Sequence, residues 1–308
     1  MQDHDVQELQ QKIRGLLREK NAILLAHNYQ RPEVQDTADL CGDSLELSIK
    51  AAGTDADVIV FCGVHFMAET AAILSPDKTV LLPVIAAGCP MADMLTADAL
   101  KMKKQEMPDA VVVSYVNTTA AVKAQSDLCC TSANAVQVAN AIDADKKILM
   151  VPDRNLAQYT KTRTGRDIRY WNGYCPIHDH LTAGQVRKVR DAHPGALFLA
   201  HPECPPEVLS LADEIKSTSG MMAFAAQSDH TTFIIGTEMG ILYPLSRANP
   251  EKTFIPADPG MICADMKRTG LGDIVTALET MSPQISVPEH IRVPAKEAVD
   301  RMLAIPGG

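Results

Sequence analysis

A cysteine motif recurs at nearly equal intervals along this chain, and its recurrence limits the folds that the chain can adopt. Cys89 stands in Gly-Cys-Pro-Met, Cys175 in Tyr-Cys-Pro-Ile and Cys263 in Ile-Cys-Ala-Asp. The first two cysteines lie 86 residues apart and the last two lie 88 apart. Self-similarity at a fixed period indicates repeated structural units. We therefore expect each repeat to place one thiol in the same way.

Two further series follow the same period. Three polar residues that each follow a short apolar run lie 88 and 86 residues apart: His27, Tyr115 and His201. A hydroxyl stands 17 residues after each of them, at Ser44, Ser132 and Thr218. The sequence thus predicts three homologous αβα units with pseudo-threefold symmetry. Their expected ranges are 1–107 with an N-terminal helix, 108–194, and 195–308 with a C-terminal extension.

Short apolar runs alternate with helical segments inside each unit. In the first unit, Ala22–Ala26 and Val58–Cys62 read as buried strands, Ser44–Ala52 reads as a helix, and residues 6–20 form an amphipathic leading helix. This alternation is typical of α/β units with parallel sheets. Ligands of such sheets bind at the carboxyl ends of the strands. We therefore expect one central site built by all three units.

Charge and composition narrow the class of partner. The 308-residue chain carries a formal net charge of −9, which disfavours nucleic acid and anionic membranes as partners. We find no signal-peptide pattern and no apolar run long enough for a transmembrane helix, so we expect a cytoplasmic protein. Eight cysteines in a reducing compartment indicate metal binding or catalysis rather than a disulfide framework.

The three periodic cysteines are the candidate metal ligands. Cys89 and Cys175 each precede a proline and a helical stretch, which predicts a cysteine at the N-cap, where the helix dipole favours the thiolate. Zinc sites usually contain paired CxxC motifs, and this sequence has none. Three single thiols better suit an iron–sulfur cubane with an open fourth iron. The alternative is that these cysteines are small core residues inherited with the repeat.

Polar residues at the strand and helix ends complete the candidate site. Hydroxyls at helix starts can cradle an anion, although simple N-capping is the alternative for each: Ser44, Ser132, Ser217 and Thr218. Groups suited to proton transfer follow the strands or the second cysteine: His27, Tyr29, Tyr115, His178, His201 and Glu203. This set indicates dehydration or condensation rather than redox chemistry.

Several of these motifs resemble the quinolinate synthase family. They are His-Asn-Tyr-Gln from residue 27, Gly-Asp-Ser-Leu from 42, Phe-Cys-Gly-Val-His-Phe-Met-Ala-Glu-Thr from 61, Tyr-Val-Asn-Thr from 115, His-Pro-Glu-Cys from 201 and Gly-Thr-Glu from 236. The resemblance implies a three-domain αβα fold around a [4Fe–4S] cluster. It also implies condensation of iminoaspartate with dihydroxyacetone phosphate to quinolinate, with loss of phosphate and water, in NAD biosynthesis. An L-aspartate oxidase or dehydrogenase would supply the imine.

The resemblance also implies roles for individual residues. Cys89, Cys175 and Cys263 correspond to the cluster ligands, although Cys263 lacks the CxxC that some members carry there. The catalytic residues implied are Tyr29, Tyr115, His201 and Glu203. The substrate-binding residues implied are His27, Ser44, Tyr115, Asn117, Ser132, His201, Glu203, Ser217 and Thr218.

Two other functions are compatible with a three-cysteine cluster. One is another [4Fe–4S] hydro-lyase that acts on a hydroxy acid. The other is a non-catalytic iron–sulfur sensor, which would need a surface for a partner. We find no basic helix, winged-helix pattern or tail in the sequence that would provide such a surface.

Overall fold

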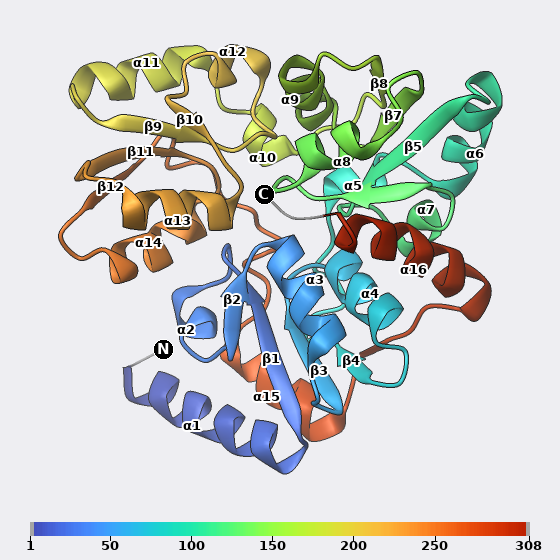
Figure 1. The fold of residues 1–308 in the computed structure, drawn as a ribbon. Helices are drawn as coiled ribbons and strands as arrows, with labels where there is room; N and C mark the ends of the chain where they lie inside the picture. Colours follow the sequence, from blue (N-terminus) through green and yellow to red (C-terminus); the bar gives the residue numbers. More distant parts are fainter. Residues whose placement is uncertain (1–2, 306–308) are drawn as a thin grey trace.

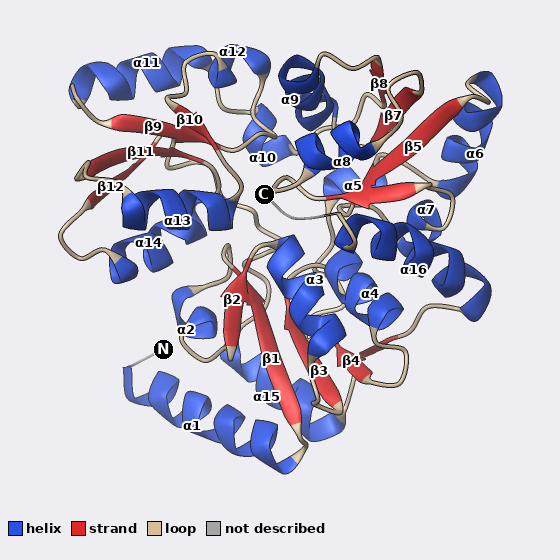
Figure 2. Cartoon of the chain, in the orientation of Figure 1, coloured by secondary structure: helices blue, strands red, loops and turns tan. Residues whose placement is uncertain are grey.

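The computed structural model describes residues 3–305 of the chain. Three separate sheets form three lobes around a common centre, with helices on the faces of each sheet (Figure 1). Figure 2 shows that each lobe combines strands with several helices. The α/β class and the three parallel sheets expected from the repeat are confirmed. The pseudo-threefold rotation and the unit boundaries stay predictions.

Four strands in each of the three sheets follow the same order. The first is β2-β1-β3-β4, the second β6-β5-β7-β8 and the third β10-β9-β11-β12, with parallel pairing throughout these strands. The strand bounds are β1 (Ala22–His27), β2 (Leu40–Gly42), β3 (Val58–Cys62), β4 (Thr79–Leu81), β5 (Ala110–Tyr115), β6 (Leu128–Cys130), β7 (Lys147–Val151), β8 (Ile168–Tyr170), β9 (Leu197–Ala200), β10 (Glu214–Ile215), β11 (Thr232–Gly236) and β12 (Thr253–Pro256). A repeated strand order is what a repeated sequence unit should produce.

Seventeen helical segments are seen between residues 3 and 305. They are α1 (Asp3–Glu19), α2 (Pro32–Gln35), α3 (Ser44–Gly53), α4 (His65–Leu74), α5 (Pro90–Asp93), α6 (Ala97–Glu106), α7 (Ala120–Lys123), α8 (Ala135–Ala141), α9 (Arg154–Thr164), α10 (Pro176–Asp179), α11 (Ala183–Ala192), α12 (Pro206–Leu209), α13 (Thr218–Gln227), the 3-10 turn η1 (Met239–Ile241), α14 (Leu242–Ala248), α15 (Leu271–Thr280) and α16 (Glu289–Leu303). No helix within residues 3–305 combines the length and apolar character needed to span a bilayer.

The central strands are apolar because helices cover both faces of their sheets. All five residues of β3, Val-Ile-Val-Phe-Cys, are buried. A strand covered on both faces shows a continuous apolar run instead of an alternating one, and β-branched side chains favour the extended conformation. Each fully buried aliphatic side chain contributes about 1.5–3 kcal/mol of transfer free energy. These strands therefore anchor the loops at their carboxyl ends.

The helix that follows each cysteine loop packs on the sheet of the next unit. Leu100 of α6 shares a buried cluster with Val112 of the second sheet, and Val186 of α11 shares one with Phe198 of the third. Helix α15 closes the ring, because its apolar face packs with α1, β1 and β3 of the first unit. Packing thus assigns α6 and α11 to the sheet that follows each of them in the chain and α15 to the first sheet, although the repeat places each helix in the unit of its cysteine.

The C-terminal segment ties the first two lobes together. Strand β13 (Gln284–Ile285) pairs antiparallel with β4 at the edge of the first sheet. Helix α16 then lies against α7 and β6 of the second lobe and α4 of the first (Figure 1). The repeat does not predict these contacts, because the segment has no counterpart in the other two units. The expected leading helix at 6–20 is confirmed as α1.

Candidate active site

A cavity of about 230 Å³ lies where the carboxyl ends of the strands of the three lobes meet. All but one of the site residues implied by the sequence line it: His27, Tyr29, Ser44, Cys89, Tyr115, Asn117, Ser132, Cys175, His201, Glu203, Thr218 and Cys263. Apolar side chains such as Val64 and Phe66 form part of the wall. The exception is Ser217, which lies outside this lining. Residues more than 200 positions apart are therefore brought into one enclosed space.

The three periodic cysteines all reach this cavity, one from each unit. Cys89 is the N-cap residue of α5 and Cys175 that of α10, each with proline at the start of the helix, as expected. Cys263 differs, because it lies in the loop between β12 and α15 and no regular helix begins directly after it. All eight cysteines are free thiols, and the other five do not contribute to the lining of this cavity.

The expectation that the helix dipole makes the Cys89 and Cys175 thiols acidic does not hold, because burial outweighs the effect of the helix start on their pKa values. Burial raises the pKa of Cys89 to about 12, and it also raises the pKa of Cys175 and of Cys263. The helices that Cys89 and Cys175 cap span only four residues each, and so short a stack of peptide dipoles offsets little of the desolvation. Without a bound cation the thiols are protonated at neutral pH, so metal binding must displace their protons.

The residues fit an iron–sulfur cluster by their donor chemistry. Three thiols enter one cavity from three different loops, and thiolates are the usual ligands of such clusters. Apolar residues next to the cysteines, including Met91 and Ile177, shield the space from water. The donor set leaves one position of a four-iron cluster without a cysteine.

A second possible metal-binding group consists of Cys175, His178 and Glu203, whose ligand atoms lie within 4.8 Å of one another. Both ring nitrogens of His178 already have partners. Nδ1 lies 2.7 Å from Glu203 Oε2 and 3.2 Å from Cys175 Sγ, and Nε2 lies 2.7 Å from the Thr237 hydroxyl. A metal would have to replace these hydrogen bonds. The arrangement therefore favours a proton-transfer role for His178 over metal ligation.

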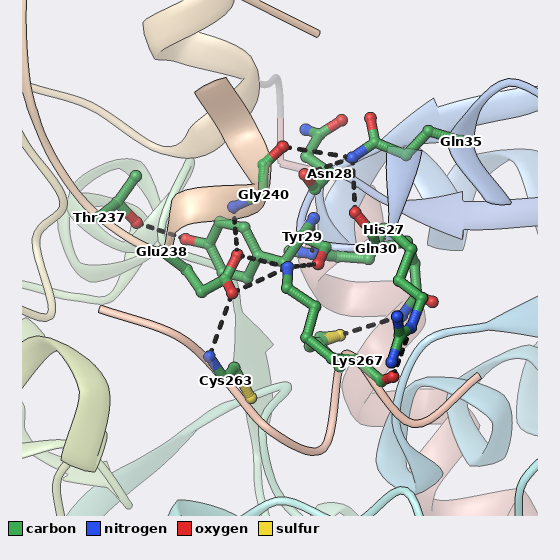
Figure 3. Close-up of polar contacts among 12 residues, drawn as sticks. His27, Asn28, Tyr29, Gln30, Gln35, Thr237, Glu238, Gly240, Cys263 and Lys267 are labelled. Carbon is green, nitrogen blue, oxygen red and sulfur yellow. Dashed lines mark hydrogen bonds and ion pairs between the residues drawn. The ribbon is translucent and has the colours of Figure 1, made fainter. Parts of the chain in front are cut away.

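A buried chain of hydrogen bonds connects Tyr29 to Glu203. The Tyr29 hydroxyl lies 2.5 Å from the Thr237 hydroxyl, a contact drawn in Figure 3, and Thr237 in turn contacts His178 Nε2. The ionised Glu203 beside Nδ1 favours the tautomer in which Nδ1 carries the proton and Nε2 accepts one. This hydroxyl–imidazole–carboxylate order is the arrangement that activates a hydroxyl in hydrolases.

The Glu203 carboxylate stays ionised in spite of its burial. Burial alone would raise the pKa of Glu203, but the neighbouring His178 and His201 rings, with hydrogen bonds from His178 and Tyr115, lower it to about 2. Tyr115 lies against this carboxylate and the Ser132 hydroxyl, and burial together with the Glu203 charge raises its pKa. Burial and the same charge also raise the pKa of Tyr29. Both tyrosines are therefore neutral proton donors at rest.

Two further histidines face the cavity in the neutral form. Burial lowers the pKa of His27 to about 3, with Lys267 adding to the effect, and burial likewise lowers the pKa of His201 to about 3. His27 Nδ1 accepts a hydrogen bond from the Tyr29 amide at 3.1 Å, and His201 Nδ1 accepts one from the Glu203 amide at 3.3 Å. Each Nε2 then carries the proton and can donate it to a ligand oxygen.

The hydroxyl series serves more than one purpose. Thr218 opens α13 and accepts a hydrogen bond from Asn28 of the first unit at 3.0 Å. Ser217, expected to bind substrate, instead caps α13 and donates to Asp43 Oδ2 at 3.1 Å. Asp43, not Ser44, caps α3, and Asn134, not Ser132, is the N-cap residue of α8. Ser217 is thus an N-cap residue outside the cavity lining, and its contact with substrate stays a prediction, while Ser44, Ser132 and Thr218 line the cavity.

Comparison with known proteins agrees with this geometry. The family described as "Quinolinate synthetase A protein" matches residues 11–304. The chain is 56% identical over 299 residues to the quinolinate synthase of Geotalea uraniireducens, covering 97% of this chain and 98% of that protein. It is 57% identical over 298 residues to the quinolinate synthase of Geobacter metallireducens, with the same coverage.

The chain belongs to the quinolinate synthetase A family.

The chain is also 52% identical over 298 residues to quinolinate synthase 1 of Methanosarcina acetivorans. For this member of the quinolinate synthetase A family, the sequence alone assigned no site role to Thr237 and Glu238, although both stand in the Gly-Thr-Glu motif from residue 236. The signal was present, because both directly follow β11, and residues at the carboxyl end of a parallel strand are candidates for ligand contact. Neither residue belongs to one of the three series of residues that recur with the period of the repeat. The repeat therefore did not reveal them.

Proposed function

We propose that this chain is a quinolinate synthase. It would condense iminoaspartate with dihydroxyacetone phosphate to form quinolinate, with release of phosphate and water, as a step in NAD biosynthesis. The observation that carries the proposal is the convergence of three thiols and the Tyr29–Thr237–His178–Glu203 chain on one cavity. An L-aspartate oxidase or dehydrogenase would provide the unstable imine.

Cys89, Cys175 and Cys263 would hold a [4Fe–4S] cluster as its three protein ligands. When bound, this group supplies a Lewis acid that polarises a hydroxyl or carbonyl oxygen of the substrate. The protein contributes the enclosure, because the thiols lie in a cavity lined partly by apolar residues. Exclusion of water strengthens every electrostatic contact inside such a site. We classify the activity as that of a condensing transferase.

Neutral donors would bind the anionic substrates. His27 and His201 can each donate from Nε2, and Asn117, Ser44 and Thr218 add an amide and two hydroxyls. Ser44 and Thr218 are the first residues of the ten-residue helices α3 and α13, whose N-termini favour negative charge. This local arrangement explains how an acidic chain could hold carboxylates and a phosphate.

Proton movement would follow the buried hydrogen-bond chain. The Tyr29 hydroxyl can donate to Thr237 as the Thr237 hydroxyl donates to His178 Nε2. Transfer of both protons in this direction leaves a tyrosinate that can take a proton from the substrate. It also leaves an imidazolium, which Glu203 stabilises at 2.7 Å. Tyr115, next to Glu203, is placed to donate its own proton to a departing oxygen.

The test is anaerobic purification and cluster reconstitution, followed by iron and sulfide analysis and a product assay. Iminoaspartate is generated in the reaction mixture and dihydroxyacetone phosphate is added. We expect about four irons per chain and formation of quinolinate. A protein that contains the cluster but forms no quinolinate would overturn the proposal. It would favour another hydro-lyase or an iron–sulfur sensor instead. Omission of dihydroxyacetone phosphate provides the blank.

A further inference from the structure

The third thiol lacks the helix that positions the other two. Cys89 and Cys175 cap α5 and α10, whereas Cys263 lies in an irregular loop between β12 and α15. A loop by itself holds a side chain less precisely than a capped helix start. The position of Cys263 must therefore come from contacts made by the loop with its surroundings.

The fully buried carboxylate of Glu238 provides the first of these contacts. Its Oε1 accepts a hydrogen bond from the Cys263 amide at 3.1 Å, and its Oε2 accepts one from the Gly240 amide at 2.7 Å. Glu238 follows β11, so the Cys263 backbone is fixed to the end of a central strand. Figure 3 shows the carboxylate between the two amides.

Lys267 provides the second contact and extends it to another unit. Its Nζ lies 2.8 Å from Glu238 Oε1 and 3.0 Å from Oε2, and it also donates to the backbone carbonyl of Tyr29. Tyr29 belongs to the first unit, while Glu238 and Lys267 belong to the third. This ion pair, whose carboxylate is buried and whose lysine is partly exposed, thus joins the loop of the candidate third ligand to the backbone of a candidate catalytic residue.

Gly240 shows how closely the two units meet at this point. A Cβ atom at residue 240 would lie 2.6 Å from Lys267 Nζ and 2.7 Å from the Tyr29 carbonyl oxygen. The Tyr29 oxygen is a backbone atom that cannot rotate away. A side chain here would force the Tyr29 loop and the Lys267 loop apart. The contact between the Tyr29 loop and Lys267 therefore cannot accommodate a side chain at residue 240.

We propose that Glu238 and Lys267 are positioning residues that set the place of the Cys263 thiol and couple it to Tyr29. The pair acts through the Cys263 amide and the Tyr29 carbonyl. This proposal rests on the proposed function, because a fixed position of the Cys263 thiol matters only if Cys263 is a cluster ligand.

The first test uses the cluster-free protein, in which thiol reactivity reports the freedom of each loop. Alkylation of Cys263 is timed by peptide mass spectrometry, with Cys89 and Cys175 as internal references. In the double variant Glu238→Gln/Lys267→Met we expect the Cys263 rate to rise about tenfold relative to Cys89. This double variant leaves no unpaired buried charge, so it should fold where a single replacement could fail.

Lys252→Met is the matched control. Lys252 also lies in the third unit, and its Nζ donates to the carbonyls of Ala225 and Ser228 at 2.6 and 2.8 Å. Its loss should lower the Tm without changing the ratio of the Cys263 and Cys89 alkylation rates.

A second pair of variants tests the close approach at Gly240. Gly240→Ala should raise the ratio of the Cys263 and Cys89 alkylation rates, whereas Gly272→Ala, which adds a Cβ in open space, should not.

The second test uses the reconstituted protein. We expect faster loss of iron to a chelator from Glu238→Gln/Lys267→Met than from Lys252→Met, together with an altered electron paramagnetic resonance spectrum of the reduced cluster. An unchanged ratio of alkylation rates would overturn the proposal, and so would an equal rise at all three cysteines. A wild-type protein that makes no quinolinate would overturn the proposed function alone, because alkylation of the cluster-free protein needs neither cluster nor substrate.

Discussion

His178 Nδ1 lies 2.7 Å from Glu203 Oε2, and both side chains are almost completely buried. This contact places an imidazole between a carboxylate and the Thr237 hydroxyl, which in turn contacts Tyr29. His178 follows Cys175 by three residues in the one-turn helix α10. The same short segment thus offers a candidate ligand and the centre of the proton-transfer chain.

Removal of the Thr237 hydroxyl should separate proton transfer from cluster binding. Thr237→Val keeps the shape of the side chain but breaks the contacts to Tyr29 and His178. We expect kcat to fall by about 10²–10⁴, the usual contribution of a positioned acid–base group, while iron content is unchanged. Thr237→Ser restores the hydroxyl and should recover most of the rate. Equal activity of the Val and Ser variants would show that the chain carries no proton.

Loss of any one periodic cysteine should abolish the intact cluster. Cys89→Ala, Cys175→Ala and Cys263→Ala should each lose the absorption near roughly 400 nm that such clusters show. Cys62→Ala is the control, because that thiol is buried in the core of the first sheet and does not line the cavity. A full complement of iron and sulfide in any of the first three variants would contradict the ligand assignment.

The cluster-free thiols should react slowly at neutral pH. Burial raises the pKa of Cys89 to about 12, and only the thiolate is nucleophilic. The alkylation rate of Cys89 should therefore still rise between pH 9 and 10, where free cysteine levels off. Cluster assembly should release protons, since the thiols bind as thiolates. A rate that levels off near pH 7 would instead restore the expectation of a dipole-activated thiolate.

Acid should destabilise the fold between about pH 6.5 and 4.5. The folded-state pKa values of His27 and His201 are lowered by burial to about 3, from a usual value of 6.5. The unfolded state then binds more protons in this window, so the free energy of unfolding falls as pH falls. The slope is at most about 1.4 kcal/mol per pH unit for each histidine.

Urea unfolding of the cluster-free protein at pH 7, 5.5 and 4.5 measures this slope. His27→Gln removes one of the two buried histidines and should flatten it. The window stops at 4.5 because Glu203, whose pKa is lowered to about 2, adds its own loss of stability below that pH. The buried Asp43 and Asp153, whose pKa values are raised by burial, act in the opposite direction in both proteins, so an equal slope in the wild type and in His27→Gln would contradict the assignment of a neutral His27.

The hydroxyl series should divide into ligand-binding and structural members. Ser132→Ala and Thr218→Val should weaken binding of quinolinate by about 1–3 kcal/mol per hydrogen bond lost to a charged group, with iron content preserved. Ser217→Ala should act mainly on the Tm, because its hydroxyl caps α13 and binds Asp43. Calorimetric titration and thermal unfolding of the three variants measure the two effects. Binding unchanged in both Ser132→Ala and Thr218→Val would make these residues structural as well.

The sequence by itself determined the repeated α/β unit and where its candidate functional residues stand. The buried strands that end at His27, Tyr115 and Ala200 could be located from apolar runs, because a strand covered on both faces needs a continuous run. Chain connectivity then places polar residues at the carboxyl ends of those strands. The three cysteines could be identified from their spacing alone, before any contact was known.

Only the tertiary structure decided which of these residues touch. Helices α6, α11 and α15 each pack on the sheet of a neighbouring lobe. Which sheet they cover depends on where a matching apolar surface lies, and the spacing of a repeat does not specify this. Whether Ser217 binds a ligand or Asp43 depends on a residue 174 positions away.

The charge states of the site also required the fold. The dipole of a short helix and the burial of a thiol act in opposite directions on the pKa of Cys89, and burial prevails. The extent of burial is known only when all three lobes enclose the cavity. Thr237, Glu238 and Lys267 gain their roles in the same way, because hydrogen bonds between units depend on distances that local sequence does not set.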